Sequence, residues 1–240
     1  MPPSQPIRIW AIVPAAGIGS RMQSEKPKQY LPLLGQTLIE VTLKKILQLE
    51  VLEGIVLPLH ADDTFWSTTS LYRHPKIHCV DGGTERSDSV LAGLKYCRSQ
   101  TNNSDDWVLV HDAARPCVTL EKIEQLISLV SIENNCDGAI LAVPCADTIK
   151  RVDGHSITHT EDRSQLWLAH TPQLFPLSTL LSALDQALIS GKPITDEASA
   201  IESSGGKVQV VQDRRDNIKV TVPEDLLWAE TVLKQQGFSG

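Results

Sequence analysis

A short stretch near the N-terminus combines small residues with cations, which suits it to holding phosphate groups. It reads Pro14-Ala-Ala-Gly-Ile-Gly-Ser-Arg-Met22, followed by Lys26-Pro-Lys-Gln-Tyr30. Gly17 and Gly19 let the backbone pass close to a ligand, and consecutive N–H groups of such a loop can form a nest for an anion. Arg21 and Lys28 add two positive charges beside it. These features favour a triphosphate site over the alternative, a tight turn flanked by solvated cations.

Familiar phosphate-binding and catalytic motifs do not fit the chain. A dinucleotide-binding fingerprint needs a third small residue where the bulky Met22 stands, and a Walker A loop needs Gly-Lys-Ser/Thr, which is absent. There is no Gly-x-Ser-x-Gly elbow and no His-Glu-x-x-His sequence. The first loop is therefore a nucleotide site of another kind.

A second candidate loop reads Asp81-Gly-Gly-Thr-Glu-Arg-Ser-Asp-Ser89. Paired glycines allow close approach of the backbone to a flat ligand such as a base. Ser89 can donate or accept a hydrogen bond near the start of a helix. The alternative is a glycine turn followed by an ordinary helix cap.

A third candidate loop reads His111-Asp-Ala-Ala-Arg-Pro116. Asp112 is expected at the carboxyl end of a buried strand, with Arg115 three residues later. The carboxylate could hold a sugar hydroxyl or a hydrated metal ion, and the guanidinium could bind phosphate. A structural Asp–Arg pair is the alternative. Thr171, Thr195 and Lys219 also lie in strand-end contexts, where each alone is more often structural.

Strand-like and helix-like segments alternate along the chain and must position these loops. The pattern predicts strands at 7–13, 54–59, 76–81, 107–111, 138–143, 207–212 and 217–220. It predicts helices at 38–50, 85–98, 119–132, 176–189 and 195–202, and a last helix opened by Thr221-Val-Pro-Glu224. This alternation predicts an α/β fold with a Rossmann-like, mostly parallel sheet and helices on both faces. Ligands of such sheets bind at the carboxyl ends of the strands, where the candidate loops lie.

One segment interrupts the alternation. Residues 147–152 and 155–161 flank Asp153-Gly154, a dipeptide typical of a two-residue hairpin turn. A lone two-stranded hairpin is marginal in water. We therefore expect a protruding arm at about 144–168 that packs on something else, such as a second subunit, although a solvated surface hairpin is the alternative.

The composition of the chain excludes several classes of protein. The chain has 240 residues, 41% of them hydrophobic, which favours one large globular domain over 1–240. A net charge of −7 argues against a nucleic-acid or anionic membrane surface. Five widely spaced cysteines indicate buried free thiols rather than disulfides or a zinc site. Because neither a signal sequence nor a long apolar run occurs, a soluble cytoplasmic protein is expected.

The motifs together resemble one family. PAAGIGSRM with KPKQYLPL, DGGTERSDSVLAGL, VHDAARP, DTIKRV, HTEDRSQLWLAHTPQLF, ITDEASAIE and DNIKVTVPEDL resemble the 2-C-methyl-D-erythritol 4-phosphate cytidylyltransferases of the non-mevalonate isoprenoid pathway. The resemblance implies that CTP and methylerythritol phosphate react with Mg²⁺ to give 4-diphosphocytidyl-methylerythritol and pyrophosphate. The substrate phosphate would attack the α-phosphorus of CTP in line.

The resemblance also implies roles for residues. Arg21 and Lys28 would stabilise charge on the α-phosphate, and Lys219 would be a further catalytic lysine. The residues that would bind the nucleotide are Ala15, Ala16, Gly17, Gly83, Ser89, Asp112 and Ala113. The nest argument from the residues adds Gly19 to them. Asp112 would also face the metal, directly or through water. The sugar phosphate would meet Asp112, Arg115, Thr171 and Thr195, and the arm of a homodimer partner would deliver Thr148 and Arg163.

Two other functions stay open. A ribitol 5-phosphate cytidylyltransferase would use the same cations and loops on another small polyol phosphate. A non-catalytic nucleotide-binding protein would keep the glycine loop but could lose Arg21, Lys28 and Lys219, all of which are present. Ser20 and Thr84 differ from the arginine and aspartate of some family members. Because the chain ends at Gly240, a fused cyclase domain is not expected.

Overall fold

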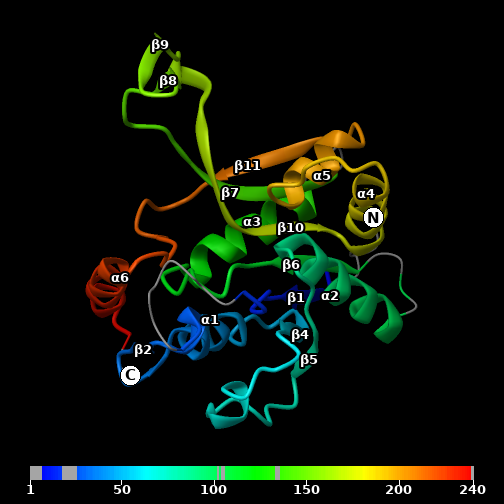
Figure 1. The fold of residues 1–240 in the computed structure, drawn as a ribbon. Helices are drawn as coiled ribbons and strands as arrows, with labels where there is room; N and C mark the ends of the chain where they lie inside the picture. The colour runs from blue at the N-terminus through cyan, green and yellow to red at the C-terminus, as the bar shows by residue number, and fades with distance from the viewer. Residues whose placement is uncertain (1–6, 18–25, 102, 104–105, 133–135, 239–240) are drawn as a thin grey trace.

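A seven-stranded sheet forms the centre of the molecule (Figure 1). The computed structural model describes residues 7–17, 26–101, 103, 106–132 and 136–238. The strand order is β11-β7-β10-β6-β1-β4-β5. The strands are β1 (Ile9–Ile12), β4 (Leu52–Leu59), β5 (Ile77–Asp81), β6 (Trp107–Val110), β7 (Gly138–Pro144), β10 (Trp167–Pro176) and β11 (Val208–Gln212).

The sheet is mostly parallel, as the alternation predicts. β1 pairs in parallel with β4 and β6, β4 with β5, and β11 with β7. β10 runs antiparallel to both of its neighbours, β6 and β7. The predicted α/β fold with a mostly parallel sheet is therefore confirmed.

Helices cover both faces of this sheet. They are α1 (Leu38–Ile46), α2 (Arg86–Gln100), α3 (Leu120–Ile132), α4 (Leu177–Ile189), α5 (Glu197–Ser203) and α6 (Pro223–Gln235). Side chains alternate along β1: Ile9 and Ala11 share a core with α1 and α3, while Trp10 and Ile12 share another with α2, α4 and α5. A third cluster joins α6 to α1 through Leu38. Because both faces of β1 are buried, the strand is apolar throughout.

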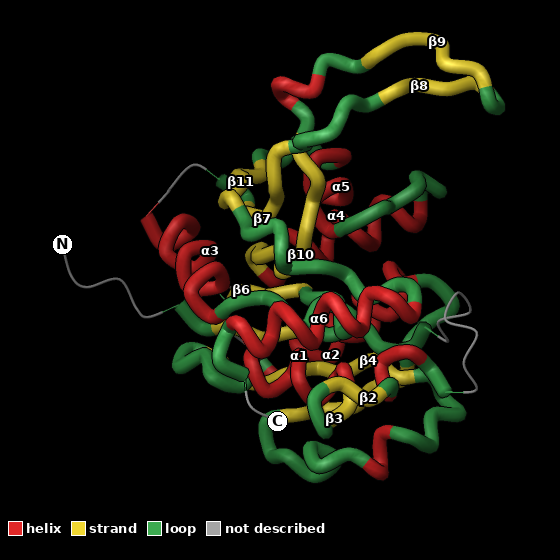
Figure 2. The backbone as a smooth tube through the Cα atoms, turned by 90° about the vertical axis from the view of Figure 1, so that its left-hand side faces the viewer, coloured by secondary structure: helices red, strands yellow, loops and turns green. Residues whose placement is uncertain are grey.

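The arm is present and projects beyond the sheet (Figures 1 and 2). It consists of β8 (Lys150–Asp153) and β9 (Ser156–Thr160), all of whose residues are exposed. The predicted turn at Asp153-Gly154 is wrong by one residue, because Asp153 pairs with Ser156 and leaves Gly154 and His155 as the loop. Gly154 has φ +58, which suits the first loop position of a type II′ turn.

Strand β10 was not expected. Pro172 near its middle cannot donate a ladder hydrogen bond, which argues against a central strand at the sequence level. The structure places Pro172 at a register shift between Ala169 and Gln173 in the pairing with β7. An irregularity in the ladder thus accommodates the proline inside the sheet.

One predicted strand and one predicted helix end are also wrong. The segment 217–220 is not a strand. It lies beside the loop after β6, where the Val220 N–H donates to the Ala114 carbonyl at 2.8 Å, and this one backbone bond does not make a ladder. Helix α1 ends at Ile46 rather than near Glu50, since the chain tightens into i→i+3 bonds there before β4 begins. The Thr37–Glu40 capping box at its start is confirmed.

Two short antiparallel strands, β2 (Pro32–Leu33) and β3 (Gln36–Thr37), lead into α1. The five cysteines are free, but the expectation that all are buried is wrong. Cys97 and Cys117 are buried, Cys136 and Cys145 are partly exposed, and Cys79 on the edge strand β5 is exposed. Among the described helices, none has both the length and the apolar character that crossing a membrane requires.

Candidate active site

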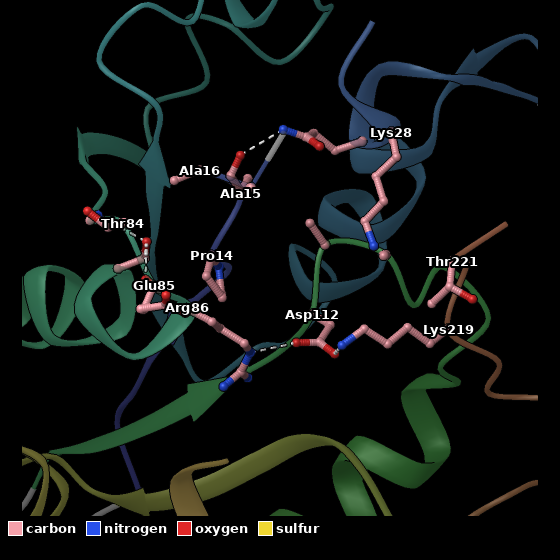
Figure 3. Close-up of a pocket in the computed structure, with 16 residues that line it drawn as sticks. Pro14, Ala15, Ala16, Lys28, Thr84, Glu85, Arg86, Asp112, Lys219 and Thr221 are labelled. Atoms are coloured by element: carbon pink, nitrogen blue, oxygen red, sulfur yellow. Dashed lines mark hydrogen bonds and ion pairs between the residues drawn. The ribbon is translucent and has the colours of Figure 1, made fainter. Parts of the chain in front are cut away.

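A cavity of about 500 Å³ opens at the carboxyl ends of β1, β5 and β6 (Figure 3). Three loops wall it, each following one of these strands, and the segment before α6 closes it. The residues lining it are Pro14, Ala15, Ala16, Gly17, Lys28, Gln29, Gly83, Thr84, Glu85, Arg86, Ser89, Asp112, Ala113, Ala114, Lys219 and Thr221. Its position is the one expected for a ligand of a parallel sheet.

Most of the predicted nucleotide and catalytic residues meet in this cavity. They are Ala15, Ala16, Gly17, Lys28, Gly83, Ser89, Asp112, Ala113 and Lys219. Five predicted substrate residues do not line it: Arg115, Thr148, Arg163, Thr171 and Thr195. Gly19, Ser20 and Arg21 lie outside the described residues.

Lys28 is held at the cavity wall by its neighbours in the chain. It begins a 3-10 turn, Lys28–Tyr30, in which the buried Gln29 donates from Nε2 to the Ala15 carbonyl at 2.7 Å. Tyr30 donates its hydroxyl to Asp63 at 2.8 Å. The Lys28 ammonium donates to the Val220 carbonyl at 3.2 Å. The turn is thus anchored on both sides while its lysine faces the cavity.

The glycines of the second loop are needed for packing. A Cβ at Gly82 would lie 2.5 Å from the Ala16 Cβ, and one at Gly83 would overlap the Asp88 side chain. The Gly83 N–H donates to the Ser89 hydroxyl at 3.1 Å, and that hydroxyl donates to the Glu85 carbonyl at 3.3 Å. Close packing therefore requires both glycines before any ligand is considered.

Asp112 lies among cations at the base of the cavity. Its Oδ2 is 2.7 Å from Lys219 Nζ and 3.7 Å from Arg115 Nε, and its Oδ1 accepts from Arg86 Nε at 3.0 Å. Burial would raise the pKa of Asp112, but Arg86 and Lys219 together hold it well below its usual range. The carboxylate is therefore ionised at neutral pH, and Figure 3 shows it between Arg86 and Lys219.

The backbone of Asp112 is held from behind by a relay of neutral groups. Its N–H donates to Thr171 Oγ1 at 3.0 Å, and that hydroxyl lies 3.0 Å from His111 Nδ1. His111 Nε2 lies 3.0 Å from the Arg115 carbonyl, which can only accept. The proton of His111 is therefore assigned to Nε2, and Nδ1 accepts from Thr171. Burial lowers the pKa of His111 to about 4, which keeps the ring neutral.

Of the residues predicted for the sugar phosphate, Asp112 lines the cavity and the others do not. Arg115 is buried and donates from Nη1 to the Asn217 carbonyl at 2.7 Å. Thr195 is exposed just before α5, and its N–H donates to Ser199 Oγ at 3.2 Å. Thr148 and Arg163 are exposed on the arm, where Arg163 donates to the Ala146 carbonyl.

Sequence reasoning missed an ion pair beside Asp112. Arg86 Nη1 and Nη2 donate to the two carboxylate oxygens of Glu197 at 2.6 and 3.0 Å. Arg86 stands in the quoted loop 81–89 and Glu197 in the quoted ITDEAS segment, but the two are 111 residues apart. The sequence shows that one residue is basic and the other acidic, but their pairing depends on the fold.

The described residues could meet a triphosphate with Lys28, Lys219 and the backbone of Ala15–Gly17. In the described part of the chain, no group of three or more His, Cys, Asp or Glu side chains could hold a metal ion by itself. Asp112 is nevertheless an ionised carboxylate at the cavity wall. Magnesium commonly binds through one or two carboxylates, waters and substrate phosphates, so the residues present fit a metal brought in by the nucleotide.

Comparison with known proteins identifies the family. The family model for 2-C-methyl-D-erythritol 4-phosphate cytidylyltransferase matches residues 9–235. The chain belongs to this family. The resemblance read from the motifs is thereby confirmed.

Relatives of the same name match nearly end to end. The cytidylyltransferase of Haemophilus influenzae is 51% identical over 226 residues, covering 94% of this chain and 96% of the relative. That of Shewanella frigidimarina is 50% identical over 234 residues, covering 97% and 99%. The crystal structure of the Francisella tularensis 2-C-methyl-D-erythritol 4-phosphate cytidylyltransferase superposes with a TM-score of 0.80 at 36% identity, covering 94% of this chain and 100% of that one.

Proposed function

We propose that the protein transfers the cytidylyl group of CTP to 2-C-methyl-D-erythritol 4-phosphate. The products are 4-diphosphocytidyl-2-C-methyl-D-erythritol and pyrophosphate. The family match over residues 9–235 is the observation that carries this proposal. The cavity supports it, because it combines a small-residue loop, two lysines and a buried carboxylate at the carboxyl edge of the sheet.

The reaction needs positioning and charge stabilisation more than covalent help. A phosphate oxygen of the sugar phosphate attacks the α-phosphorus of CTP, and the bond to the bridging oxygen of pyrophosphate breaks. Lys28 and Lys219, together with Arg21 outside the described residues, would stabilise the charge that develops on the α-phosphoryl oxygens. The backbone of Ala15–Gly17 would approach the phosphates, and Gly83 and Ser89 would meet the base.

Asp112 and Ala113 would face the ribose and the metal side of the nucleotide. The site suits Mg²⁺ that would be held mainly by the triphosphate, and Asp112 would be its protein ligand, directly or through water. When bound, Mg²⁺ neutralises phosphate charge. The protein's own contribution is to keep Asp112 ionised by means of Arg86 and Lys219.

Arg115, Thr171 and Thr195 are assigned to the sugar phosphate. Arg115 and Thr171 already contact Asp112 or its backbone, so a substrate at this place would adjoin Asp112. Removal of the Arg115 charge would also leave the Asp112 carboxylate less well compensated. Its variants therefore report on both roles at once.

The arm is proposed to join two copies of the chain. Val152 and Ile157 on the arm are 56% and 63% exposed, and Trp167 and Leu168 at its base are 43% and 52% exposed. Such apolar side chains on a two-stranded hairpin call for a partner surface. In a homodimer of single domains spanning residues 1–240, Thr148 and Arg163 would complete the partner's substrate site.

Pyrophosphate release tests the function directly. CTP and Mg²⁺ are supplied with methylerythritol phosphate or, in parallel, with ribitol phosphate, and chelation of the metal serves as a control. We expect turnover with the first substrate only, and its loss with EDTA. Turnover mainly with ribitol phosphate would show that the protein is a ribitol 5-phosphate cytidylyltransferase instead. Tight CTP binding without turnover on either substrate would favour a non-catalytic nucleotide-binding protein.

A further inference from the structure

Arg86 and Glu197 form a fully engaged ion pair between two helices. Arg86 is the first residue of α2, and Glu197 is the first residue of α5. The two carboxylate oxygens of Glu197 accept hydrogen bonds from Nη1 and Nη2 of Arg86. Nε of the same guanidinium donates to Asp112 Oδ1 at 3.0 Å. All three guanidinium nitrogens thus donate to carboxylates of the protein.

We propose that Glu197 is a positioning residue that acts through Arg86 to orient the Asp112 carboxylate in the active site. This inference rests on the proposed cytidylyl transfer. Asp112 shares its other oxygen with Lys219 at 2.7 Å. The orientation of the carboxylate therefore also sets where the Lys219 ammonium stands.

Glu197 is placed too deep to meet a substrate. Its side chain is 1% exposed, and it does not line the cavity, whereas Arg86 does. A buried carboxylate is stable only when it is paired and hydrogen-bonded, and Arg86 supplies both. Glu197 can therefore influence the cavity only through the guanidinium that it holds.

Glu197, which anchors Arg86, is itself held in place by strand β10 of the sheet. Gln173 on β10 accepts from the Ala198 N–H through Oε1 at 2.9 Å and donates through Nε2 to Asp196 Oδ2 at 2.9 Å. Asp196 caps α5 by accepting from the Ser199 N–H. Glu197 stands between these two clamped residues, so its backbone has little freedom. A path of direct contacts therefore leads from β10 through Glu197 and Arg86 to Asp112.

Loss of Glu197 would leave the Arg86 charge less well compensated and would also change the geometry near the nucleotide. Without Glu197, the Arg86 guanidinium would be free to turn both of its terminal nitrogens toward Asp112. An Arg–carboxylate pair is strongest in that two-pronged arrangement. It would compete with Lys219 for the same carboxylate and displace the lysine from its place at the cavity wall.

The test compares Glu197→Gln, Arg86→Gln, Arg86→Lys and the double variant Arg86→Gln/Glu197→Gln. The double variant removes both charges, so it leaves no unpaired charge buried. Each variant is assayed for kcat and both KM values, and for its melting temperature. Glu53→Gln is the matched control, since Glu53 pairs with Arg8 at 3.1 Å in an exposed position at the amino ends of β4 and β1, opposite to the cavity.

We expect Glu197→Gln to lower kcat by about 10-fold or more while the KM for CTP changes by less than about threefold. The same substitution made on top of Arg86→Gln should change kcat by less than about twofold, because the anchor then has nothing to hold. Arg86→Lys should not restore kcat, since one ammonium cannot replace the three-nitrogen fork. Glu53→Gln should leave kcat unchanged.

Several results would overturn the inference. One is a Glu197→Gln enzyme with kcat within about twofold of the parent. Another is an effect of Glu197→Gln that persists in the Arg86→Gln background, and a third is full rescue by Arg86→Lys. In each case the parent enzyme is active, so the proposed function stands. A parent enzyme that releases no pyrophosphate would overturn the proposed function, and this inference with it.

Discussion

Replacing Lys28 by alanine is expected to lower kcat by about 10²–10³-fold. A preorganised donor aimed at developing charge is typically worth about 3–4 kcal/mol in the transition state. The same ammonium donates a part-buried hydrogen bond of 3.2 Å to the Val220 carbonyl. Such a bond contributes only about 0.5–1.5 kcal/mol to stability. The larger loss should therefore fall on turnover and the smaller one on folding.

The turn that carries Lys28 should survive the substitution. Gln29 holds it to the Ala15 carbonyl at 2.7 Å, and Tyr30 holds it to Asp63 at 2.8 Å. Neither contact involves the lysine side chain. The cavity loop after β1 should thus keep its shape in the variant.

The assay is pyrophosphate release at saturating CTP and methylerythritol phosphate, with the melting temperature measured beside it. Lys26→Ala is the matched control, because Lys26 is an exposed lysine two residues away that does not line the cavity. We expect the control to keep its kcat. A Lys28→Ala enzyme within a few-fold of the parent kcat would refute a role in charge stabilisation. A large fall in melting temperature would show that the lysine acts on the fold instead.

Three further predictions concern the arm, the relay behind Asp112 and the glycines. Arg163→Ala should raise the KM for methylerythritol phosphate and leave CTP affinity nearly unchanged. Mixing the Arg163→Ala and Lys28→Ala proteins should restore activity in heterodimers. Failure to restore activity would count against a site shared between two subunits. Because burial lowers the pKa of His111 from 6.5 to about 4, its contribution to stability is present above pH 6.5 and is lost as pH falls. Urea unfolding should therefore show a loss of about 2 kcal/mol between about pH 7.5 and about pH 5 that His111→Gln lacks; an unchanged pH dependence in the variant would contradict this. Gly83→Ala should lower the melting temperature because its Cβ would overlap Asp88, whereas Gly17→Ala, whose Cβ meets nothing within 4 Å, should raise the KM for CTP without that loss. Equal melting temperatures for the two variants would show that the loop after β5 tolerates a side chain.

The fold was largely predictable because hydrophobic periodicity is a local signal. Ile9–Ile12 is apolar at every position, and a strand that is buried on both faces needs that pattern. The Thr37–Glu40 spacing likewise predicts a helix start from four adjacent residues. Where a tertiary contact decides, the prediction is wrong or missing: β10 keeps Pro172 inside the sheet, and residues 217–220 follow a loop instead of forming a strand.

The candidate site was predictable where residue type alone implies chemistry. Glycines beside Lys28 after a first strand, and an aspartate after a buried strand, already indicate a phosphate site at the carboxyl edge of the sheet. The structure brings Lys28, Asp112 and Lys219 to one cavity although they are far apart in sequence. The glycines show the limit of such reasoning, because Gly82 and Gly83 are also required by packing against Ala16 and Asp88.

Burial separates the charged residues that work in the site from those that are only solvated. Arg86 and Arg214 both pair with carboxylates, yet the Arg86 side chain is 30% exposed and its partner Glu197 is 1% exposed, against 49% and 26% for Arg214 and Asp216. An exposed pair contributes little, whereas loss of one member of a buried pair leaves an uncompensated charge. A buried carboxylate must find a cation, and the fold presents Arg86 to Glu197. The same guanidinium reaches Asp112, and in this way a requirement of the core becomes a constraint on the geometry of the cavity.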